Sequence, residues 1–598
     1  MRLRALGLPR WQRGRDLVCR QTLFQHSTRT VLCASQRRAY ATPVEPPQQL
    51  KNDTREKVVI LGSGWAGYVL SRHLDPKKYR VLIVSPRSYF VFTPLLNDTT
   101  VGTLEFRNVL ESVRKRNSKV EYVQGWADDV NFVDKFITVE PSVLDPDVGH
   151  ALTGPRKVNE ERTNDVLERT LHAGGTSKTQ VPTFPVSYDK LVIAVGCYSQ
   201  TFNTKGVREN AMFLKDVRDA QAIRRRILEL FELARLPIIP EETKRYLLHF
   251  AIVGGGPTGM EFAACLSDLI RDDISRLHPQ LLKYIQITLY DVAPKVLPMF
   301  DASLADYAVK QYKRQNVQIK TSHDVEELRK GFPNDPEARQ NQANQVKGRV
   351  YTIRTKQEGD VGIGLCVWST GNKNNPFIEK ALNHVRRFPV RSAQITQGGA
   401  TAVENPNTRQ WIIERDARSG SLLIDDHFRV NLTTDAAIDA EVNGDPDHGH
   451  DPQPHAYVKD VFALGDATKL KSGALPATAQ VANQQALWLA KALNKYPDPE
   501  AFAQNKGFTF RNLGVFTYIG GAKAVLQGPP VSGRGGNGNG NGNGGVASKA
   551  SGLNFRGWIA FLLWRGAYLT MTLSWRNKFL VPIQWVAVKL FGRDVSRF

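Results

Sequence analysis

Short apolar runs that end in a glycine-rich turn recur along the chain. Residues 57–61 (KVVIL) and 249–253 (HFAIV) are two such runs, and each turn is followed by a stretch typical of a helix. A second apolar run follows each helix, at 79–84 and 285–290. Continuous apolar runs of this length are typical of strands buried on both faces, as in parallel sheets. The pattern predicts two strand–turn–helix–strand units of α/β structure.

The first turn has the spacing G-x-G-x-x-G and comprises Gly62, Ser63, Gly64, Trp65, Ala66 and Gly67. In a strand-to-helix turn the first glycine permits the tight bend, the second lets backbone approach a pyrophosphate, and the third lets helix and strand pack. The helix N-terminus then faces the phosphate charge. The motif has its required context, so it predicts a Rossmann-like dinucleotide-binding domain.

The second turn comprises Gly254, Gly255, Gly256, Pro257, Thr258 and Gly259, and the strand after its helix ends at Asp291. A carboxylate there accepts hydrogen bonds from an adenine ribose and repels a 2′-phosphate, which favours NADH over NADPH. Gly256 and Asp291 are 35 residues apart, compared with about 20 in the usual fingerprint. We attribute the excess to a longer helix and loop around residues 271–284.

The first unit lacks this acid. Its second strand leads into Ser85, Pro86 and Arg87, which we assign to the first cofactor. Ser85 and Arg87 are also compatible with a 2′-phosphate, hence with NADP. What favours FAD is a later apolar strand that ends at Gly465-Asp466, because in flavoproteins with two dinucleotide domains such an aspartate reaches the ribityl chain and phosphate.

Two further apolar strands end at Gly196 and Gly371. They resemble the A-T-G motif at which the chain leaves each nucleotide domain, although Val195 replaces the threonine in the first. Any one of these strands alone is equally compatible with an ordinary core strand. Their order along the chain favours the cofactor interpretation.

Several segments together resemble type II NADH dehydrogenases, the single-chain, non-pumping NADH:ubiquinone oxidoreductases of mitochondria and bacteria. Residues 85–96 (SPRSYFVFTPLL) resemble the segment after the FAD fingerprint of that family. The resemblance implies that Thr93 and Pro94 lie against the isoalloxazine. Residues 254–261 resemble the family's G-G-G-P-T-G-x-E motif.

Nearer the C-terminus, residues 475–484 (LPATAQVANQ) resemble the family's A-Q-x-A-x-Q segment, which lines its quinone pocket. Residues 564–568 and 574–578 resemble the membrane-docking tail of fungal members. The chain departs from the family at Asn483, where some relatives carry histidine, and at Cys265, where an acid is usual.

Three residues are predicted to be catalytic. Glu261, expected in the first turn of the second unit's helix, is assigned a proton-carrying role toward the quinone; the alternative is an acid that stabilises its helix dipole. Gln480 and Gln484 stand at i and i+4, on one helix face, and the resemblance implies that they donate hydrogen bonds to quinone carbonyls. Without the resemblance, two such glutamines would indicate solvated surface.

The net charge of +22 is concentrated at the two ends of the chain. Residues 1–40 hold nine arginines and one aspartate, which is typical of a mitochondrial transit peptide, with cleavage expected near Ala41. A disordered basic tail is the alternative. Residues 553–598 hold seven basic residues and one acid. The remainder is close to neutral for its length, which disfavours nucleic acid as a partner.

The C-terminal segment is predicted to dock on a membrane without crossing it. Trp575, Phe579, Ile583, Val586 and Leu590 follow helical spacing, and we expect Pro582 to divide the segment into two helices. Aromatic and basic residues on amphipathic helices suit a bilayer interface. The alternative is a helix that packs on the body or forms a dimer, and a homodimer is compatible with docking. No apolar run reaches the 18 residues of a membrane span.

Cysteine spacing limits the chemistry. Cys197, Cys265 and Cys366 form no CxxC pair and no metal-ligand pattern, so we expect neither a dithiol centre nor a metal site. Residues 141–183, 330–348, 385–420 and 435–456 are polar and are predicted to be surface loops, and 533–545 to be a flexible linker.

The predicted architecture is α/β, with two Rossmann-like domains of the disulfide-reductase-like flavoprotein type and C-terminal amphipathic membrane-docking helices. The expected segments are a transit peptide at 1–40, an FAD domain at 54–246 and 374–512, an NADH domain at 247–373, and a membrane-anchoring region at 513–598.

The expected activity is electron transfer from NADH to ubiquinone through non-covalent FAD, without proton pumping, by a peripheral protein of the mitochondrial inner membrane. Residues 42–56 are polar, which favours the matrix face. The alternatives are a sulfide:quinone oxidoreductase, which would need paired cysteines, an apoptosis-inducing-factor-like flavoprotein, and a ferredoxin reductase, which would need no interfacial tail.

Overall fold

The structure is a computed structural model of the chain. It describes residues 53–114, 118–143, 183–333, 346, 348–385, 387–388, 392–396, 399–403, 411–434, 455–496, 498–529 and 554–596. The predicted transit peptide, the linker at 533–545, nearly all of the insertion at 141–183 and nearly all of the segment at 435–456 lie outside the described residues.

A first sheet is built around five parallel strands whose side chains are largely buried. Their order is β24-β8-β1-β2-β5, from His455–Ala463, Lys190–Ile193, Glu56–Leu61, Tyr79–Ser85 and Glu121–Asn131. The apolar runs 57–61 and 79–84 thus lie at its centre, as expected for strands covered on both faces. Antiparallel strands β6 (Phe136–Pro141) and β7 (Phe184–Ser187) extend one edge.

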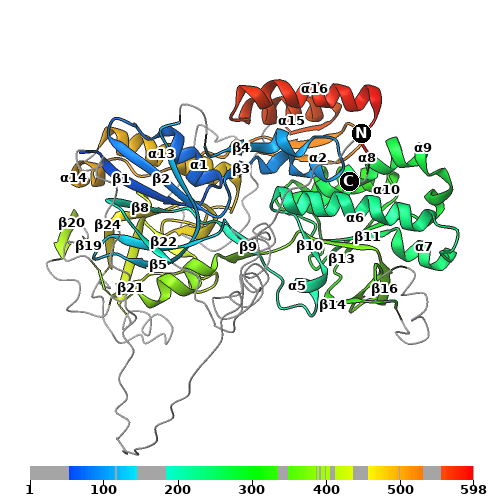
Figure 1. Ribbon diagram of the computed structural model, residues 1–598, viewed down its shortest axis with the longest axis horizontal. Helices are drawn as coiled ribbons and strands as arrows, with labels where there is room; N and C mark the ends of the chain where they lie inside the picture. The colour runs from blue at the N-terminus through cyan, green and yellow to red at the C-terminus, as the bar shows by residue number, and fades with distance from the viewer. Residues whose placement is uncertain are drawn as a thin grey trace, which may run out of the picture. The chain divides into compact units, whose positions relative to one another are not determined.

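Two helices cover this sheet side by side (Figure 1). They are α1 (Trp65–His73), which follows the first glycine turn, and α13 (Ala479–Lys495). The Tyr79 hydroxyl donates to the Leu493 carbonyl at 2.8 Å, which ties the end of α13 to the start of β2. Segments more than 400 residues apart in sequence therefore close one nucleotide-binding half.

A second parallel sheet has the strand order β10-β17-β11-β12-β13. The strands are Met212–Phe213, Leu365–Trp368, His249–Val253, Gln286–Asp291 and Val317–Thr321. The helix α8 (Pro257–Leu269) begins directly in the second glycine turn. It continues through a π-helical turn at Ile270–Ile274, the short helix α9 (Ser275–Leu277) and a 3-10 helix at Pro279–Tyr284, which confirms that extra helix and loop lengthen this unit.

The chain passes between the two halves through a two-stranded ribbon. Strand β9 (Cys197–Ser199) leaves the first sheet and pairs with β18 (Asn372–Asn374), which leaves the second. Gly196 and Gly371 directly precede these strands, and both have positive φ, 67° and 75°. Strand β10 and the helix α6 (Val217–Arg235) already pack on the second half, although they precede the predicted boundary at residue 247.

The C-terminal region comprises an antiparallel sheet and two helices. Strands β26 (Val515–Tyr518), β27 (Ala524–Gln527) and β28 (Asn554–Gly557) precede α15 (Trp558–Met571) and α16 (Trp575–Phe591). The expectation that Pro582 divides the last segment is wrong, because α16 continues through it. Val581 and Trp585 pack into the body on either side of Pro582, and this burial offsets the missing hydrogen bond.

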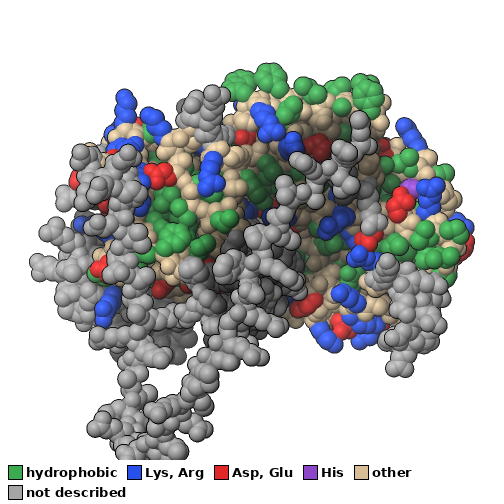
Figure 2. Space-filling model, viewed as in Figure 1, with side chains coloured by type: hydrophobic (Ala, Val, Ile, Leu, Met, Phe, Trp, Pro, Cys, Tyr) green, Lys and Arg blue, Asp and Glu red, His purple; other side chains and the backbone are tan. Residues whose placement is uncertain are grey.

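One face of these helices is apolar and exposed. Trp575, Phe579, Ile583, Val586 and Leu590 are between 58% and 75% exposed, so the predicted stripe faces away from the body. Figure 2 shows hydrophobic side chains gathered at the top of the molecule, where Figure 1 places α15 and α16. No helix among the described residues is both long and apolar enough to cross a membrane.

The predicted surface loop at 385–420 is wrong in part. It contains strands β19 (Ser392–Thr396), β20 (Gly399–Val403) and β21 (Trp411–Ile413), and the side chains of Phe388 and Trp411 are buried. Polar composition concealed these strands because β19 and β21 pair with strands that lie later in the sequence, β24 and β23 (Arg429–Thr434), and β20 pairs with β19.

Candidate functional site

The first glycine turn has the geometry that its motif predicts. Gly62 has φ of 109° and donates its N–H to the Val84 carbonyl at 2.8 Å. A β-carbon on Gly67 would lie 2.0 Å from the Gly62 carbonyl oxygen, so only glycine lets α1 pack this closely on β1. A β-carbon on Gly64 would meet no atom within 4 Å. This position is therefore open to a ligand.

Two buried serines, Ser63 and Ser85, and the half-buried Arg87 form a polar corner beside this turn. The two serine hydroxyls are 3.0 Å apart. The Arg87 guanidinium pairs with the Asp216 carboxylate at 2.7 Å, and Tyr89 donates to the same carboxylate at 2.9 Å. Because Arg87 is bound to Asp216, its charge is already neutralised, which weakens the NADP interpretation of this corner.

The Trp65 indole N–H donates to the Thr93 hydroxyl at 3.0 Å and thus links the first turn to the predicted flavin-facing segment. Thr93 and Pro94 begin a 3-10 helix, Thr93–Leu95. Thr93 lines the cavity described below, whereas Pro94 does not.

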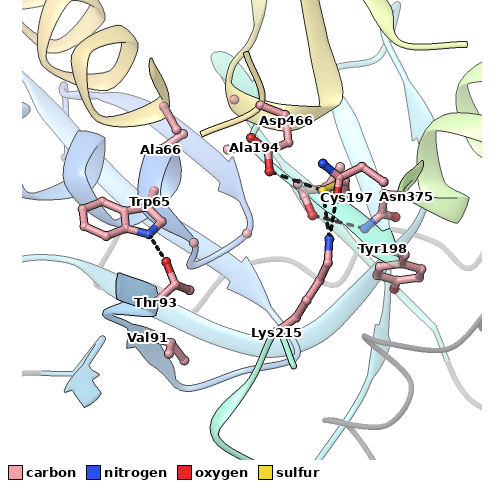
Figure 3. Close-up of a pocket in the computed structure, with 18 of the residues that line it drawn as sticks. Trp65, Ala66, Val91, Thr93, Ala194, Cys197, Tyr198, Lys215, Asn375 and Asp466 are labelled. Atoms are coloured by element: carbon pink, nitrogen blue, oxygen red, sulfur yellow. Dashed lines mark hydrogen bonds between the residues drawn. The ribbon is translucent and has the colours of Figure 1, made fainter. Parts of the chain in front are cut away.

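A cluster of three side chains meets at the carboxyl ends of β8 and β24 (Figure 3). The Cys197 thiol donates to the Asp466 carboxylate at 3.3 Å, and the Lys215 ammonium donates to the same sulfur at 3.3 Å. Lys215 also donates to the Asn372 side chain at 2.9 Å. Burial raises the pKa of Cys197 to about 11 against the attraction of Lys215, so this thiol is a neutral donor at physiological pH.

Asp466 is among the residues predicted from the sequence, whereas Cys197 and Lys215 are not. Cys197 follows Gly196 at the end of a predicted parallel strand, where ligand-facing residues gather. Its position after a strand end could therefore have identified Cys197 as a site residue. No feature of the sequence near Lys215 indicates that it reaches the site.

A cavity of about 620 Å³ joins the first turn to the second half of the molecule. Its volume is within the usual range for ligand sites, about 300–1,000 Å³. The predicted residues that line it are Gly62, Ser63, Gly64, Trp65, Ala66, Ser85, Pro86, Arg87, Thr93, Gly196, Pro257, Thr258, Gly371, Gly465 and Asp466. The predicted residues that do not are Gly67, Pro94, Gly254, Gly255, Gly256, Gly259, Glu261, Asp291, Gln480 and Gln484.

The second glycine turn repeats the backbone geometry of the first. Gly254 has φ of 117°, and a β-carbon on Gly259 would lie 2.1 Å from the Gly254 carbonyl oxygen. The Asp291 carboxylate accepts hydrogen bonds from the backbone N–H of Gly255 and, at 2.7 Å, of Ala293. These contacts hold a negative charge at the end of β12.

Glu261 lies beyond the first turn of α8, which contains no acid, so its predicted place in that turn is wrong. The side chain is buried and accepts from the Asn97 amide at 3.0 Å and from the Tyr518 backbone N–H at 3.2 Å. Burial and, to a smaller extent, nearby Asp98 raise the pKa of Glu261 to about 8, against the hydrogen bonds from Tyr518 and Asn97. A carboxyl of this pKa can hold and release a proton near neutral pH.

Gln480 and Gln484 do share one face of α13, but that face binds backbone. The Gln484 amide donates to the Arg511 carbonyl at 2.8 Å and accepts from the Arg511 N–H at 3.0 Å. Gln480 makes the corresponding pair with the Gly514 carbonyl, at 3.3 Å, and the Leu513 N–H, at 3.2 Å. The two amides fix the segment that enters the C-terminal region.

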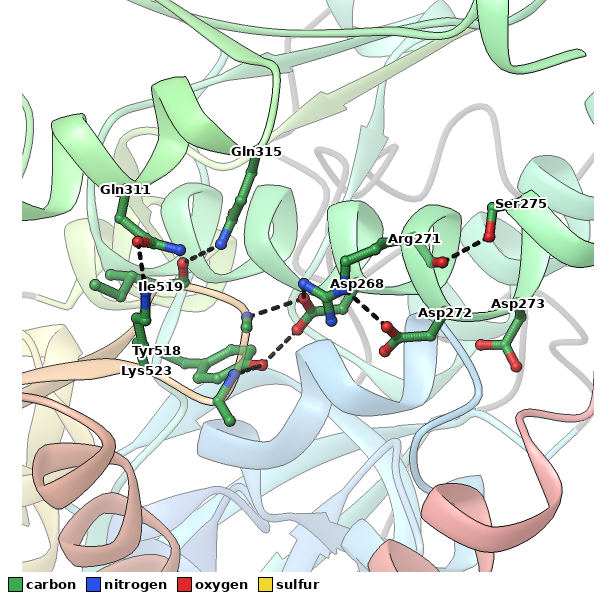
Figure 4. Close-up of polar contacts among 12 residues, drawn as sticks. Asp268, Arg271, Asp272, Asp273, Ser275, Gln311, Gln315, Tyr518, Ile519 and Lys523 are labelled. Carbon is green, nitrogen blue, oxygen red and sulfur yellow. Dashed lines mark hydrogen bonds and ion pairs between the residues drawn. The ribbon is translucent and has the colours of Figure 1, made fainter. Parts of the chain in front are cut away.

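The hairpin between β26 and β27 attaches the C-terminal region to α8 and α10 (Ala302–Arg314) (Figure 4). The Asp268 carboxylate accepts from the Tyr518 hydroxyl and, at 3.0 Å, from the Gly521 N–H. Lys523 donates to the Gln311 side chain at 3.1 Å. The helix that begins in the second glycine turn therefore also holds the region that bears the exposed apolar face.

Residues 56–390 match the family described as pyridine nucleotide-disulphide oxidoreductase, and residues 512–594 match the NDH2 C-terminal domain. The probable NADH dehydrogenase of Dictyostelium discoideum is 31% identical over 549 residues, which cover 91% of each chain. The internal alternative NAD(P)H-ubiquinone oxidoreductase A1, mitochondrial, of Solanum tuberosum is 32% identical over 564 residues, which cover 92% of this chain and 89% of that one.

Among solved structures, NDH2 from Plasmodium falciparum in complex with NADH has a TM-score of 0.64 at 22% identity, covering 91% of this chain and 100% of that chain. At this identity the likeness establishes the fold, which confirms the predicted α/β architecture with two nucleotide-binding halves. The sequence relatives go further, because they are 30% identical or more over nine-tenths of the chain. The protein therefore belongs to the pyridine nucleotide-disulphide oxidoreductases and, within them, to the type II NADH dehydrogenases, also called alternative NAD(P)H-ubiquinone oxidoreductases.

Proposed function

We propose that the protein transfers electrons from NADH to ubiquinone through non-covalently bound FAD, without proton pumping, at the mitochondrial inner membrane. The observation on which this proposal rests is one cavity that reaches both glycine turns, with residues 62–66 of the first turn and Pro257 and Thr258 of the second in its wall. Two nucleotides whose sites share one cavity can bring their reacting rings into the near contact that hydride transfer needs.

The residues in the cavity wall fit FAD. Gly64 leaves room for a pyrophosphate at the N-terminus of α1. Asp466, oriented by Cys197, would accept from ribityl hydroxyls. Trp65 and Thr93 would border the ring system. When bound, FAD accepts a hydride and can pass electrons on singly or in pairs.

The second turn fits the pyrophosphate of NADH, and Asp291 fits its adenine ribose. The carboxylate is fixed by Gly255 and Ala293, so it cannot turn away from a 2′-phosphate. Repulsion between the two charges would favour NADH over NADPH. Pro257 and Thr258 of this turn line the cavity that also contains the proposed FAD site.

Glu261 would hold the proton that accompanies electron transfer to the quinone, since its pKa of about 8 keeps it largely protonated at neutral pH. Gln480 and Gln484 remain proposed quinone-site residues. Their carbonyl oxygens each accept a backbone N–H, so any contact with quinone would come from the second hydrogen of each amide.

The exposed apolar face of α15 and α16 supports peripheral attachment to a membrane, with ubiquinone taken from the lipid phase. The matrix face and a homodimer are further proposals. The sulfide:quinone alternative would need paired cysteines; of those described, Cys197 lines the cavity, whereas Cys265 and Cys366 are buried apart from it. The ferredoxin-reductase alternative would need no exposed apolar face at the C-terminus, and an apoptosis-inducing-factor-like role is the remaining alternative.

The test is turnover by the purified full-length protein. We expect a yellow protein whose flavin absorbance is bleached by NADH but hardly by NADPH, and NADH oxidation that depends on added short-chain ubiquinone. A matched control is Asp466→Asn, which keeps the shape of the side chain but should lose flavin. A colourless protein after reconstitution with FAD, or NADH oxidation without quinone dependence, would contradict the proposal.

A further inference from the structure

A short helix, α2 (Leu96–Thr100), places two adjacent polar side chains in the interior beside α8. Asn97 and Asp98 are each 6% exposed. Asn97 donates to Glu261, as described above. Asp98 accepts from the Cys265 thiol at 3.6 Å and from the Trp585 indole N–H at 3.4 Å. One helix turn therefore contacts both the proposed proton-carrying acid and the C-terminal helix α16.

The positive groups that face Asp98 come from the C-terminal region. Arg565 of α15 attracts the Asp98 carboxylate and lies over the Trp585 ring, 4.3 Å from its centroid. Arg593, directly after α16, also attracts it, although its guanidinium is bound to Asp273 at 2.6 Å. The charge of Asp98 thus depends on how α15 and α16 are seated on the body.

The remaining titratable groups around Asp98 and Glu261 belong to neighbouring elements. They are Cys265 and Asp268 of α8, Tyr312 of α10, Tyr518 of β26 and Tyr568 of α15. Burial raises the pKa of Asp98, whereas Arg565, the indole N–H and the thiol lower it. An ionised Asp98 in turn raises the pKa of Glu261 by like-charge repulsion.

We propose that Asp98 is a positioning residue through which the seated C-terminal helices act on Glu261: held as a carboxylate by Trp585, Cys265 and Arg565, it keeps the proton on Glu261 at neutral pH. The proposal rests on the proposed role of Glu261 in quinone reduction. The C-terminal helices then have a second role besides their contact with lipid. Their packing on the body sets the pH range in which Glu261 carries a proton.

The experiment compares two tryptophan variants. Trp585→Phe keeps the ring and removes the N–H that Asp98 accepts. Trp564→Phe is the matched control, because Trp564 is also buried but its indole contacts Tyr568 and not Asp98. Asp98→Asn removes the charge directly, and Cys265→Ala removes the weaker donor. The measurement is the pH dependence of NADH:short-chain-ubiquinone turnover by the full-length, FAD-loaded protein, between about pH 6 and about pH 10.

Turnover should fall on the alkaline side as Glu261 loses its proton. Asp98→Asn removes the neighbouring charge and should move the midpoint of this fall down by about one pH unit. Trp585→Phe removes a donor that stabilises this charge, so it should move the midpoint in the same direction by a smaller amount. Cys265→Ala should move it less in the same direction, and Trp564→Phe should leave it at the wild-type value. Sedimentation with vesicles of phosphatidylcholine and cardiolipin should be the same for all variants, which separates this effect from membrane attachment.

Equal profiles for wild type, Asp98→Asn and Trp585→Phe would overturn the proposal, and so would equal shifts in the two tryptophan variants. Glu261→Gln distinguishes this failure from that of the proposed function. If Glu261→Gln retains the alkaline fall, Glu261 is not the proton carrier. If it abolishes the fall while the Asp98 and Trp585 variants behave as wild type, only the role of Asp98 is wrong. Should Asp98→Asn fail to fold, Trp585→Phe and Cys265→Ala decide the question.

Discussion

The two glycine turns are alike in backbone and differ in what surrounds them. In each, the first glycine has a positive φ, and the third lies so close to the first that a β-carbon would fall about 2 Å from its carbonyl oxygen. The strand after the first helix ends at Ser85, whose hydroxyl is paired with Ser63. The strand after the second ends at Asp291, whose carboxylate is fixed by two backbone N–H groups.

The glycine motif enforces the shape of the turn but does not determine which nucleotide binds there. Steric contact enforces the turn in both halves. The ligand is chosen by the side chain at the strand end and by groups that come from elsewhere in the chain. Lys215 and Asp466 reach the cavity beside the first turn, whereas the second turn lends this cavity only Pro257 and Thr258.

The largest effect is expected at the third glycines. Gly67→Ala and Gly259→Ala each place a methyl group against a backbone carbonyl that cannot move away, so each should lower the free energy of unfolding by about 3 kcal/mol or more. Urea unfolding followed by tryptophan fluorescence measures this. Gly64→Ala is the control, because its β-carbon meets nothing. Stable Gly67→Ala and Gly259→Ala variants would contradict the steric argument.

Acid should destabilise the second half through His249, which begins β11. Burial lowers the pKa of His249 to about 4, and its ring bonds to the Gly362 carbonyl and the Thr288 hydroxyl. The unfolded chain binds this proton near pH 6.5, so stability is lost as the pH falls from about 6.5 to about 4, by about 3 kcal/mol in all. Burial also lowers the pKa of Lys57, at the matching position of the first unit, but from an ordinary value far above this range.

Urea unfolding of wild type and His249→Gln over this pH range tests the expectation. The variant cannot titrate at this position, so the part of the acid slope due to His249 should disappear. An unchanged slope in His249→Gln would assign the acid sensitivity to other groups.

Asp291→Ser replaces the acid that ends β12 by serine, the residue that ends the matching strand of the first unit (Ser85). Without the carboxylate, the ratio of kcat/KM for NADPH to that for NADH should rise about tenfold, equivalent to about 1.4 kcal/mol. Steady-state kinetics with both nucleotides measures the ratio. Asp291→Asn is the companion variant, because it removes the charge and retains the size. A ratio unchanged in both variants would show that specificity resides elsewhere.

The smallest effects are expected at the middle glycines. A β-carbon on Gly64 or Gly256 meets no protein atom, so alanine there should leave the unfolding free energy within about 0.5 kcal/mol of wild type. Each should instead hinder the nucleotide proposed for its own half, by about fivefold. We expect Gly64→Ala to weaken FAD binding and Gly256→Ala to raise the KM for NADH. If Gly64→Ala raised the KM for NADH and Gly256→Ala weakened FAD binding, the two proposed nucleotide sites would have to be exchanged.

Much of the fold was predictable because its signals are local. The runs at 57–61 and 249–253 became central strands, and the helix after each turn began within the motif. The stripe from Trp575 to Leu590 was correctly expected to be exposed. Continuity across Pro582 was not, because it depends on burial of Val581 and Trp585 against a surface distant in sequence.

The site was predictable only in outline. Asp466 and the glycines of the first turn line the cavity as expected. Cys197 is 18 residues from Lys215 and 269 residues from Asp466 in the sequence, although the three side chains are in contact. No periodic pattern in the sequence relates residues so far apart. Likewise, nothing local to Gln480 and Gln484 indicates that their amides bind the backbone at residues 511–514.

The amino-acid sequence by itself determined the two glycine turns, the strands and helices that flank them, and the acid that ends β12, because these follow from backbone sterics and from side-chain burial over a few residues. The tertiary structure alone decided that α8 holds the C-terminal hairpin, that Asp98 meets Trp585, and that Glu261 is buried with a raised pKa. Desolvation and charge at those positions depend on which distant segments pack together, and that is a property of the folded chain.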